Sequence, residues 1–243
     1  MIFGLSWTVM GQSAEDLFKQ ANAAYKQGDY QTAVSKYEKV LQTGKVSPEL
    51  YYNLGNTYYK LNEIAPSIYY YEEAKKLNPN DEDIKYNLGL ANQMKLDKID
   101  QVPENILLRW KKKVNAWFSY NNWAWLSIFS AFFGVLVFSF FVFSKNPNTK
   151  RWAFFAMFIS LFMLLFSWYN AEYGQSLAKQ EYAIVFADAT DLMTEPNLTS
   201  DRVVSIHEGT KVKVLKQEDN WVLVKLPDGK KAWLPKEDIR VIE

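Results

Sequence analysis

The sequence contains no cysteine and only one histidine among its 243 residues. It therefore cannot form a disulfide bond, a catalytic thiolate or a thiolate metal site. A zinc site built on two histidines is likewise excluded, and a Ser-His-Asp triad would have to use His207. These absences exclude thiolate chemistry and narrow the possible metal sites, and we expect no cofactor and no metal ion. An envelope hydrolase would have to rely on carboxylates such as Asp188 and Asp191.

The chain also lacks an excess of charge, because its formal net charge is +1. The charges are nevertheless segregated along the sequence. Residues 14–100 and residues 182–243 each carry a net charge of −2, whereas residues 101–181 carry +5. Positive charge thus collects in the most apolar part of the chain, which is typical of a protein at a membrane surface and not of one that binds nucleic acid.

Two long stretches in this central part contain no charged residue. Residues 123–143 and residues 152–171 are each long enough to cross the hydrocarbon core of a bilayer, about 30 Å thick, as a helix. Tryptophans lie near the ends of these stretches, as they do at membrane–water interfaces. We predict a transmembrane hairpin. The alternative is a pair of buried helices in a soluble core.

Two sequence signals place the hairpin loop in the cytoplasm, and one signal points to the opposite orientation. The loop at residues 144–151 contains three cations, which the positive-inside rule places in the cytoplasm. Residues 1–13 are apolar and resemble a secretory signal peptide, which supports the same orientation. The basic residues at positions 109 and 111–113 oppose it. We expect a two-span protein of a bacterial inner membrane, with the domains before and after the hairpin in the periplasm and residues 172–181 as a linker.

Residues 101–122 form a basic segment just before the first predicted span. At 100° per residue, Ile106, Leu107, Trp110 and Val114 fall on one face of a helix, and the cations fall mostly elsewhere. One interpretation is an amphipathic helix that lies on anionic lipid. The other is a simple continuation of the first span.

Before the membrane segment, similar residues recur every 34 positions. Small residues recur at Ala21, Gly55 and Gly89, and aromatic residues recur three positions before each of them. This pattern resembles the tetratricopeptide repeat, a pair of antiparallel helices. The resemblance covers residues 14–100, as two full units followed by a single capping helix, and it implies an all-α solenoid.

Such solenoids bind peptides in the concave groove that is lined by the first helix of each pair. The repeat positions predict that asparagine and aromatic side chains face this groove. The candidate partner-binding residues are Phe18, Asn22, Tyr25, Tyr52, Asn53, Asn56, Tyr59, Tyr86 and Asn87. The alternative is that the aromatic residues pack between repeats and that the asparagines are merely solvated.

After the hairpin, alternating apolar residues and turn signals predict six short strands within residues 182–243. The expected fold is a small closed or nearly closed barrel. Gly209, Trp221 and the Asp228-Gly229 turn before Trp233 resemble a bacterial SH3 domain. Trp221 and Trp233 are the candidate ligand face, unless one of them belongs to the core. Between the strands, His207 is expected to be solvated, and the aspartates of the FADATD segment are interpreted as turn residues.

The order of these modules resembles the BatE-like proteins of Bacteroides aerotolerance (Bat) operons. The resemblance implies a multidomain membrane protein that works in an envelope complex with von Willebrand A-domain Bat proteins and a MoxR-type ATPase, in a role linked to aerotolerance or oxidative stress. We therefore expect a membrane-anchored, non-catalytic scaffold for protein partners, in contact with membrane lipid. The alternative is a cell-wall sensor whose SH3-like domain binds peptidoglycan.

Overall fold

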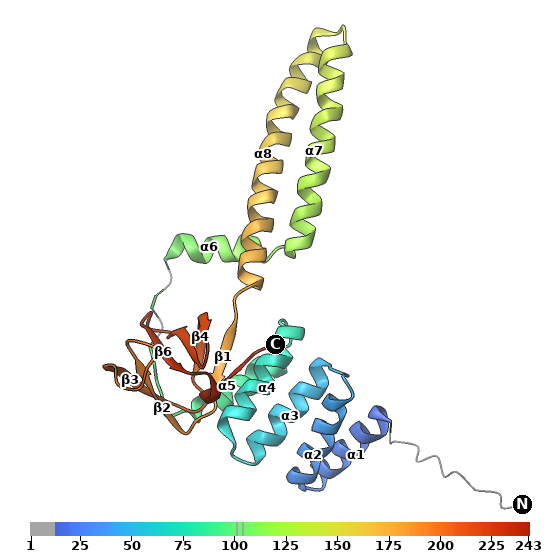
Figure 1. Ribbon diagram of the computed structural model, residues 1–243. Coiled ribbons are helices and arrows are strands. Elements are labelled where there is room, and N and C mark those ends of the chain that lie inside the picture. Colours follow the sequence, from blue (N-terminus) through green and yellow to red (C-terminus); the bar gives the residue numbers. More distant parts are fainter. Residues whose placement is uncertain (1–12, 101, 104) are drawn as a thin grey trace, which may run out of the picture. The chain divides into compact units, whose positions relative to one another are not determined.

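The fold is described from a computed structural model that covers residues 13–100, 102–103 and 105–243 (Figure 1). The predicted signal-like segment lies outside the described residues, apart from Ser13. The chain divides into two compact units. One unit combines the N-terminal helices with the C-terminal sheet, and the other contains residues 102–180.

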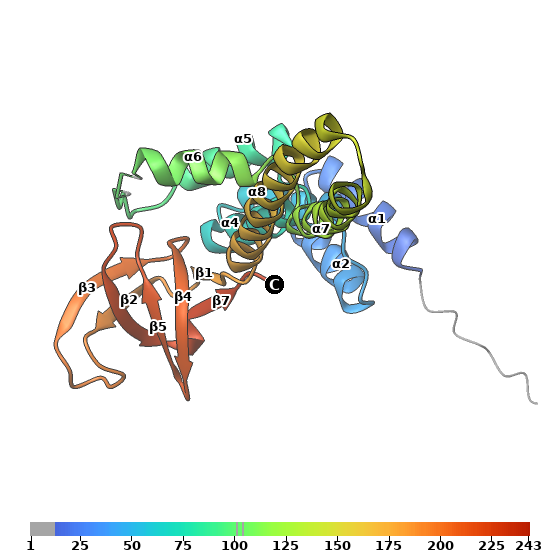
Figure 2. The same ribbon diagram turned by 90° about the horizontal axis from the view of Figure 1, so that it is seen from above.

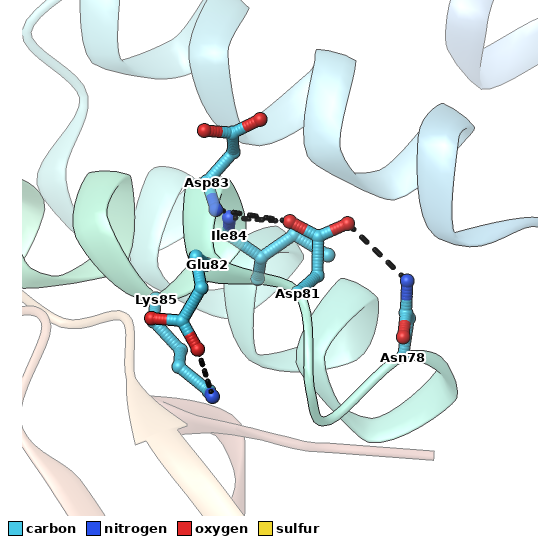
Figure 3. A network of polar contacts seen from close by, with 6 residues as sticks. All are labelled: Asn78, Asp81, Glu82, Asp83, Ile84 and Lys85. Carbon is cyan, nitrogen blue, oxygen red and sulfur yellow. Dashed lines mark hydrogen bonds and ion pairs between the residues drawn. The ribbon is translucent and has the colours of Figure 1, made fainter.

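Five helices form the N-terminal part of the first unit. They are α1 (Ala14–Lys26), α2 (Tyr30–Gln42), α3 (Pro48–Lys60), α4 (Ile64–Leu77) and α5 (Glu82–Gln93). Four of them begin at a Ser or Asp side chain that accepts hydrogen bonds from the first turn. At α5, the Asp81 carboxylate accepts hydrogen bonds from the backbone N–H groups of Asp83 and Ile84, at 3.0 and 3.1 Å. The side-chain amide of Asn78 donates to its other oxygen (Figure 3).

The small residue in each repeat has a clear structural role. Helix α1 packs on α2, and α3 packs on α4. A Cβ atom on Gly55 would lie 2.6 Å from a ring carbon of Tyr71, so only glycine allows α3 to approach α4 this closely. Gly89 occupies the equivalent position in α5, where a Cβ atom would meet nothing within 4 Å. The difference follows from the fold, because α5 has no second helix of its own repeat to pack against.

The C-terminal part of the first unit is an antiparallel sheet of seven strands. These are β1 (Tyr182–Val185), β2 (Ala189–Met193), β3 (Arg202–His207), β4 (Lys211–Glu218), β5 (Trp221–Lys225), β6 (Lys231–Pro235) and β7 (Ile239–Val241). Their order in the sheet is β3-β2-β6-β5-β4-β1-β7. Six of the strands coincide with predicted ones to within one or two residues, and β2 was not predicted.

Two predictions about this sheet were wrong. The expected barrel is not closed, since β3 and β7 are the two edges and do not pair within the described sheet. The residues after β7 bond instead to α4, where Glu243 N–H donates to Glu73 and Lys76 donates to the carbonyl of Ile242. The FADATD segment is not merely a turn, because Thr190 and Leu192 point inward from β2 while Asp191 points outward.

The second unit contains three helices: α6 (Ile106–Asn115), α7 (Tyr120–Phe143) and α8 (Pro147–Ala178). Helices α7 and α8 form a hairpin, and both are long and apolar enough to cross a membrane, with mean hydropathies of 2.4 and 1.8. Only 11% and 17% of their apolar windows are buried. Their outward faces therefore present apolar side chains to the surroundings, as lipid-facing helices do and core helices of soluble proteins do not.

The hairpin is held together by small and polar side chains at seven-residue intervals, a spacing that keeps one seam between two helices. The buried residues at this spacing are Trp123, Ser130 and Val137 in α7 and Ala153, Ser160, Ser167 and Gly174 in α8, and Asn170 in α8 is buried as well. The Ser160 hydroxyl donates to the backbone carbonyl of Ser130 at 2.7 Å. Helix α6 ends at Asn115 and α7 begins at Tyr120, so α6 is not a continuation of the first span.

Candidate partner-binding sites

Asparagine and tyrosine side chains form the same polar contact in both complete repeats. In the first, the Tyr37 hydroxyl donates to Asn22 Oδ1 at 2.5 Å, and in the second the Tyr71 hydroxyl donates to Asn56 Oδ1 at 2.6 Å. Both tyrosines are buried, and burial raises the pKa of each phenol. The hydroxyls therefore stay protonated and hold the asparagines in one orientation.

The next repeat adds a second hydrogen bond to each of these asparagines. Asn53 Nδ2 donates to Asn22 Oδ1 at 3.2 Å, and Asn87 Nδ2 donates to Asn56 Oδ1 at 2.9 Å. Asn87 also donates to the Tyr52 hydroxyl at 2.8 Å. The five side chains thus form two sets of contacts, one that links α1 to α3 and one that links α3 to α5.

This network leaves amide atoms that have no partner among the described residues. An asparagine offers two donors and one oxygen, and both lone pairs of Asn22 Oδ1 and Asn56 Oδ1 are already used. The Nδ2 groups of these two residues remain as donors, and the oxygens of Asn53 and Asn87 remain as acceptors. In the described part of the chain no buried side-chain nitrogen or oxygen lacks a partner, so these atoms are accessible to solvent.

A hollow of about 320 Å³ lies next to this network. It is lined by Tyr25, Tyr52, Asn56, Tyr59, Lys60, Tyr71, Asn87 and Leu90. Five of these were predicted as groove residues from the repeat positions, and Tyr71 comes from a second helix that the prediction did not use. Aromatic walls with a few convergent amides are typical of a site that takes one side chain of a ligand and the backbone beside it.

The other predicted groove residues have different surroundings. Asn22 and Asn53 belong to the polar network but do not line the hollow, and Phe18 packs against the buried ring of Tyr37 at 5.7 Å between centroids. Tyr86 is 68% exposed and does not line the hollow either. The hollow therefore contains five of the nine predicted residues, and the assignment of the full set to a partner-binding groove stays a prediction.

The two candidate tryptophans lie on the outer face of the sheet. In β5 and β6, Val222, Val224 and Leu234 point into the core, whereas Trp221 and Trp233 alternate with them and stay partly exposed. Register pairs Trp221 with Pro235 and Leu223 with Trp233, so the tryptophans are diagonal neighbours on one face. Neither tryptophan is part of a hydrophobic core in the described structure.

Three comparisons with known proteins bear on these sites. Residues 21–62 match a TPR repeat model, residues 48–81 match a tetratricopeptide repeat model, and residues 185–241 match the model of the YKFC SH3b2 domain. Both modules therefore have recognised types. They suggest a role in protein interaction or cell-wall binding, and such domains are typically non-catalytic.

No curated protein matches the chain significantly. Among solved structures, the chain is similar to an NlpC/P60 family protein from Bacillus cereus, with 21% identity over 29% of this chain and a TM-score of 0.23. The matched region spans 23% of the length of that protein.

The repeats and the SH3b domain are packed directly against each other. Ile184 of β1 and Ile242, just after β7, share one hydrophobic core with α4 residues such as Ile68. Beside this core, the Arg240 guanidinium lies 4.7 Å from the ring centre of Phe186 and 5.2 Å from that of Tyr69. The two modules thus form one body joined by apolar and cation–π contacts.

A polar cluster completes this interface. The Asp97 carboxylate, in the loop after α5, accepts from the backbone N–H of His207 at 2.6 Å and from the Thr210 hydroxyl at 2.7 Å, and it lies 2.8 Å from His207 Nδ1. Partial burial opposes ionisation of Asp97, but these hydrogen bonds outweigh it and lower its pKa. His207 is therefore not the solvated side chain that the sequence predicted. Nearby, Lys211 pairs with Glu72 at 2.8 Å.

Proposed function

We propose that this protein is a membrane-anchored scaffold whose repeat groove binds an extended segment of a partner protein. The observation that carries the proposal is the pair Asn56 and Asn87, whose amides are fixed by hydrogen bonds to their neighbours and which line the hollow. Alternating acceptors and donors match the N–H and C=O groups of an extended backbone. Because the asparagines are already oriented, a ligand does not have to order them on binding.

The chemistry of the hollow narrows the kind of segment that fits. Four tyrosines and Leu90 supply apolar area, and Lys60 is the only charged side chain in the lining. We expect a segment that places one aromatic or branched apolar side chain in the hollow, near a polar or acidic neighbour that can reach Lys60. The SH3b domain, with Trp221 and Trp233 outward, would supply a second contact.

Contacts within the first unit support the proposed arrangement at the membrane. The SH3b domain follows the hairpin in sequence and yet touches α4 and Asp97, which precede it. Both modules must then lie in one compartment, as two spans require. We place this compartment in the periplasm of a bacterial inner membrane, because the hairpin loop contains Lys145, Lys150 and Arg151 and because the sequence of residues 1–13 resembles a secretory signal peptide.

The order of modules supports a more specific role. It resembles that of BatE-like proteins, and on this basis we propose an envelope complex that includes von Willebrand A-domain Bat proteins and a MoxR-type ATPase, linked to aerotolerance. Segments of these proteins are the first ligands to test.

The groove can be tested with the full chain in lipid nanodiscs, screened against a displayed library of random linear peptides. The variant Asn53→Ala with Asn87→Ala removes the two amide oxygens that remain as acceptors for a ligand, but it leaves the hydroxyls of Tyr37 and Tyr71 bonded to their own asparagines. Two hydrogen bonds of about 1 kcal/mol each correspond to a loss of affinity of roughly thirtyfold.

The matched control is Asn80→Ala with Asn92→Ala, which makes the same chemical change outside the hollow. Selected peptides should bind the control as tightly as the unchanged protein. The groove is not the binding site if no peptide is selected, or if selected peptides bind the Asn53/Asn87 variant with undiminished affinity.

A second candidate function is peptidoglycan binding by the SH3b domain, which the outward tryptophans favour, since aromatic faces stack on apolar faces of ligands. Solubilised full-length protein would then sediment with purified sacculi, and Trp221→Ala with Trp233→Ala would abolish sedimentation. Recovery of the unchanged protein in the supernatant would eliminate this function.

A further inference from the structure

Helix α6 is amphipathic, and nothing in the described structure covers its apolar side. Ile106 and Leu107 are 66% and 76% exposed, and Trp110, one turn further on, is 61% exposed. All the charged residues of this helix are basic: Arg109, Lys111, Lys112 and Lys113. An exposed apolar stripe bordered by cations alone fits an anionic lipid surface better than a soluble environment.

The position of α6 relative to the hairpin is fixed by buried polar contacts. Asn115, at the end of α6, donates through Nδ2 to the backbone carbonyl of Asn170 in α8 at 2.6 Å. Its own carbonyl accepts from the indole N–H of Trp123 in α7 at 3.0 Å. A Cβ atom on Gly174 would come within 3.1 Å of Asn115 Oδ1, so the glycine leaves room for this contact. One asparagine thus ties α6 to both helices.

These contacts turn α6 across the end of the hairpin. In Figure 1 the hairpin runs lengthwise and α6 lies transverse to it, and the view from above in Figure 2 shows the same arrangement, with α6 extending sideways from α8. If α7 and α8 cross a membrane, a helix with this direction runs along the membrane plane. The end from which it extends is where α7 begins and α8 finishes.

Aromatic contacts indicate the depth of α6. The Lys111 ammonium lies 3.8 Å from the ring centre of Tyr173 and 4.8 Å from that of Tyr169, both in α8. Trp117 and Trp168 are exposed at this same end of the hairpin. Tyrosine, tryptophan and lysine side chains concentrate at the level of the lipid headgroups, where rings meet the acyl chains and cations meet phosphates.

We propose that α6 lies in the headgroup layer of the membrane, with Ile106, Leu107 and Trp110 towards the acyl chains, and that its basic residues bind the phosphates of anionic phospholipids. The proposal rests on the proposed membrane insertion of the hairpin. It adds a specific lipid-binding surface that would set the height and tilt at which the chain leaves the bilayer.

The depth of α6 can be measured by single cysteine labelling, since the chain has no cysteine of its own. Three variants are labelled with an environment-sensitive fluorophore in nanodiscs that contain brominated, anionic phospholipid. Leu107→Cys reports the apolar face, Lys112→Cys reports a position about 140° around the helix, and Phe133→Cys reports the outer face of α7.

Bromine should quench the fluorophore at positions 107 and 133, and quenching at 107 should be at least about twice that at 112, as expected for an in-plane helix. Quenching at 133 without quenching at 107 would overturn the proposal. The apolar face of α6 would then be assigned to contact with a protein partner. Absence of quenching at 133 would refute the membrane hairpin itself, so the two failures are distinguishable.

The lipid specificity needs a separate measurement. Protein is purified from vesicles of mixed phosphatidylcholine and phosphatidylglycerol, and the retained lipid is quantified. Phosphatidylglycerol should be enriched over its bulk fraction, and Lys112→Gln with Lys113→Gln should lower that enrichment by up to about fivefold per lysine. The control Lys19→Gln with Lys26→Gln makes the same charge change in α1. Equal enrichment in both variants would show that α6 does not select anionic lipid.

Discussion

Replacing Gly209 with alanine tests whether the SH3b domain and the repeats form one body. Gly209 follows β3 with a φ of +79°, a left-handed conformation that costs an L-residue about 1 kcal/mol. In addition, a Cβ atom here would lie 3.0 Å from Ile64 Cγ2 and 3.0 Å from Ile68 Cδ1 in α4. Ile68 is fully buried and has to shift within a packed core to admit the new atom, so we expect overpacking to add about 1–3 kcal/mol.

A matched control separates the backbone cost of Gly209→Ala from the cost of its clash with α4. Gly28 has a φ of +81°, but a Cβ atom there would meet nothing within 4 Å. Gly28→Ala therefore reports the backbone cost alone, and Gly209→Ala reports the backbone cost together with the clash at the interface. We expect Gly209→Ala to lower the free energy of unfolding of its module by about 2–4 kcal/mol, against about 1 kcal/mol for Gly28→Ala.

The assay is hydrogen exchange of detergent-solubilised full-length protein, followed by mass spectrometry of peptides from α4 and from β3 and β4. Loss of the interface should speed exchange in α4 as well as in the strands, because Ile68 and Tyr69 contact residues of the sheet in the unchanged protein. Equal effects of the two alanines on stability, or faster exchange confined to the strands, would refute the docked arrangement.

Three further predictions follow from single residues. Gly55→Ala should lower the melting temperature of the repeats, because its Cβ atom would overlap the Tyr71 ring, whereas Gly89→Ala should raise stability by about 0.5–1 kcal/mol through helix propensity alone. Burial raises the pKa of Glu73 in the folded state above 4.5, its value in the unfolded chain. The free energy of unfolding should therefore fall as pH rises from 4.5 through that raised pKa. Glu73→Gln should remove this fall in denaturation curves measured across the same pH range. Asn115→Ala should release α6 from the hairpin, which would appear as a broader distance distribution between spin labels at positions 107 and 133.

The repeats were predictable because their constraints are local and recur. A small residue every 34 positions, with capping Ser or Asp before most helices, specifies helix pairs whatever lies further along the chain. Gly55 against Tyr71 shows the physical reason for one such position. The amide network was predicted only in part. The repeat positions place Asn56 and Asn87 on one face, but they do not reveal which of their amide atoms form hydrogen bonds within the protein.

The features that the sequence did not predict depend on contacts between distant segments. Asp97 and His207 are 110 positions apart, and neither has a local pattern that marks it as an interface residue. The open sheet has the same origin. A closed barrel is the expectation for strands considered alone, but the residues that follow β7 are bound by Glu73 and Lys76 of α4.

The contact between the two modules also constrains the membrane topology without any reference to charge. The chain leaves the first unit after residue 101 and returns to it at Glu181, and Asp97 bonds to His207 and Thr210. Two segments that touch must lie on one side of a membrane, so the intervening residues cross it an even number of times. A hairpin in which both α7 and α8 span the membrane satisfies this condition. An arrangement in which only one of the two helices spans the membrane does not. Charge alone would be indecisive here, because basic residues lie at both ends of the hairpin.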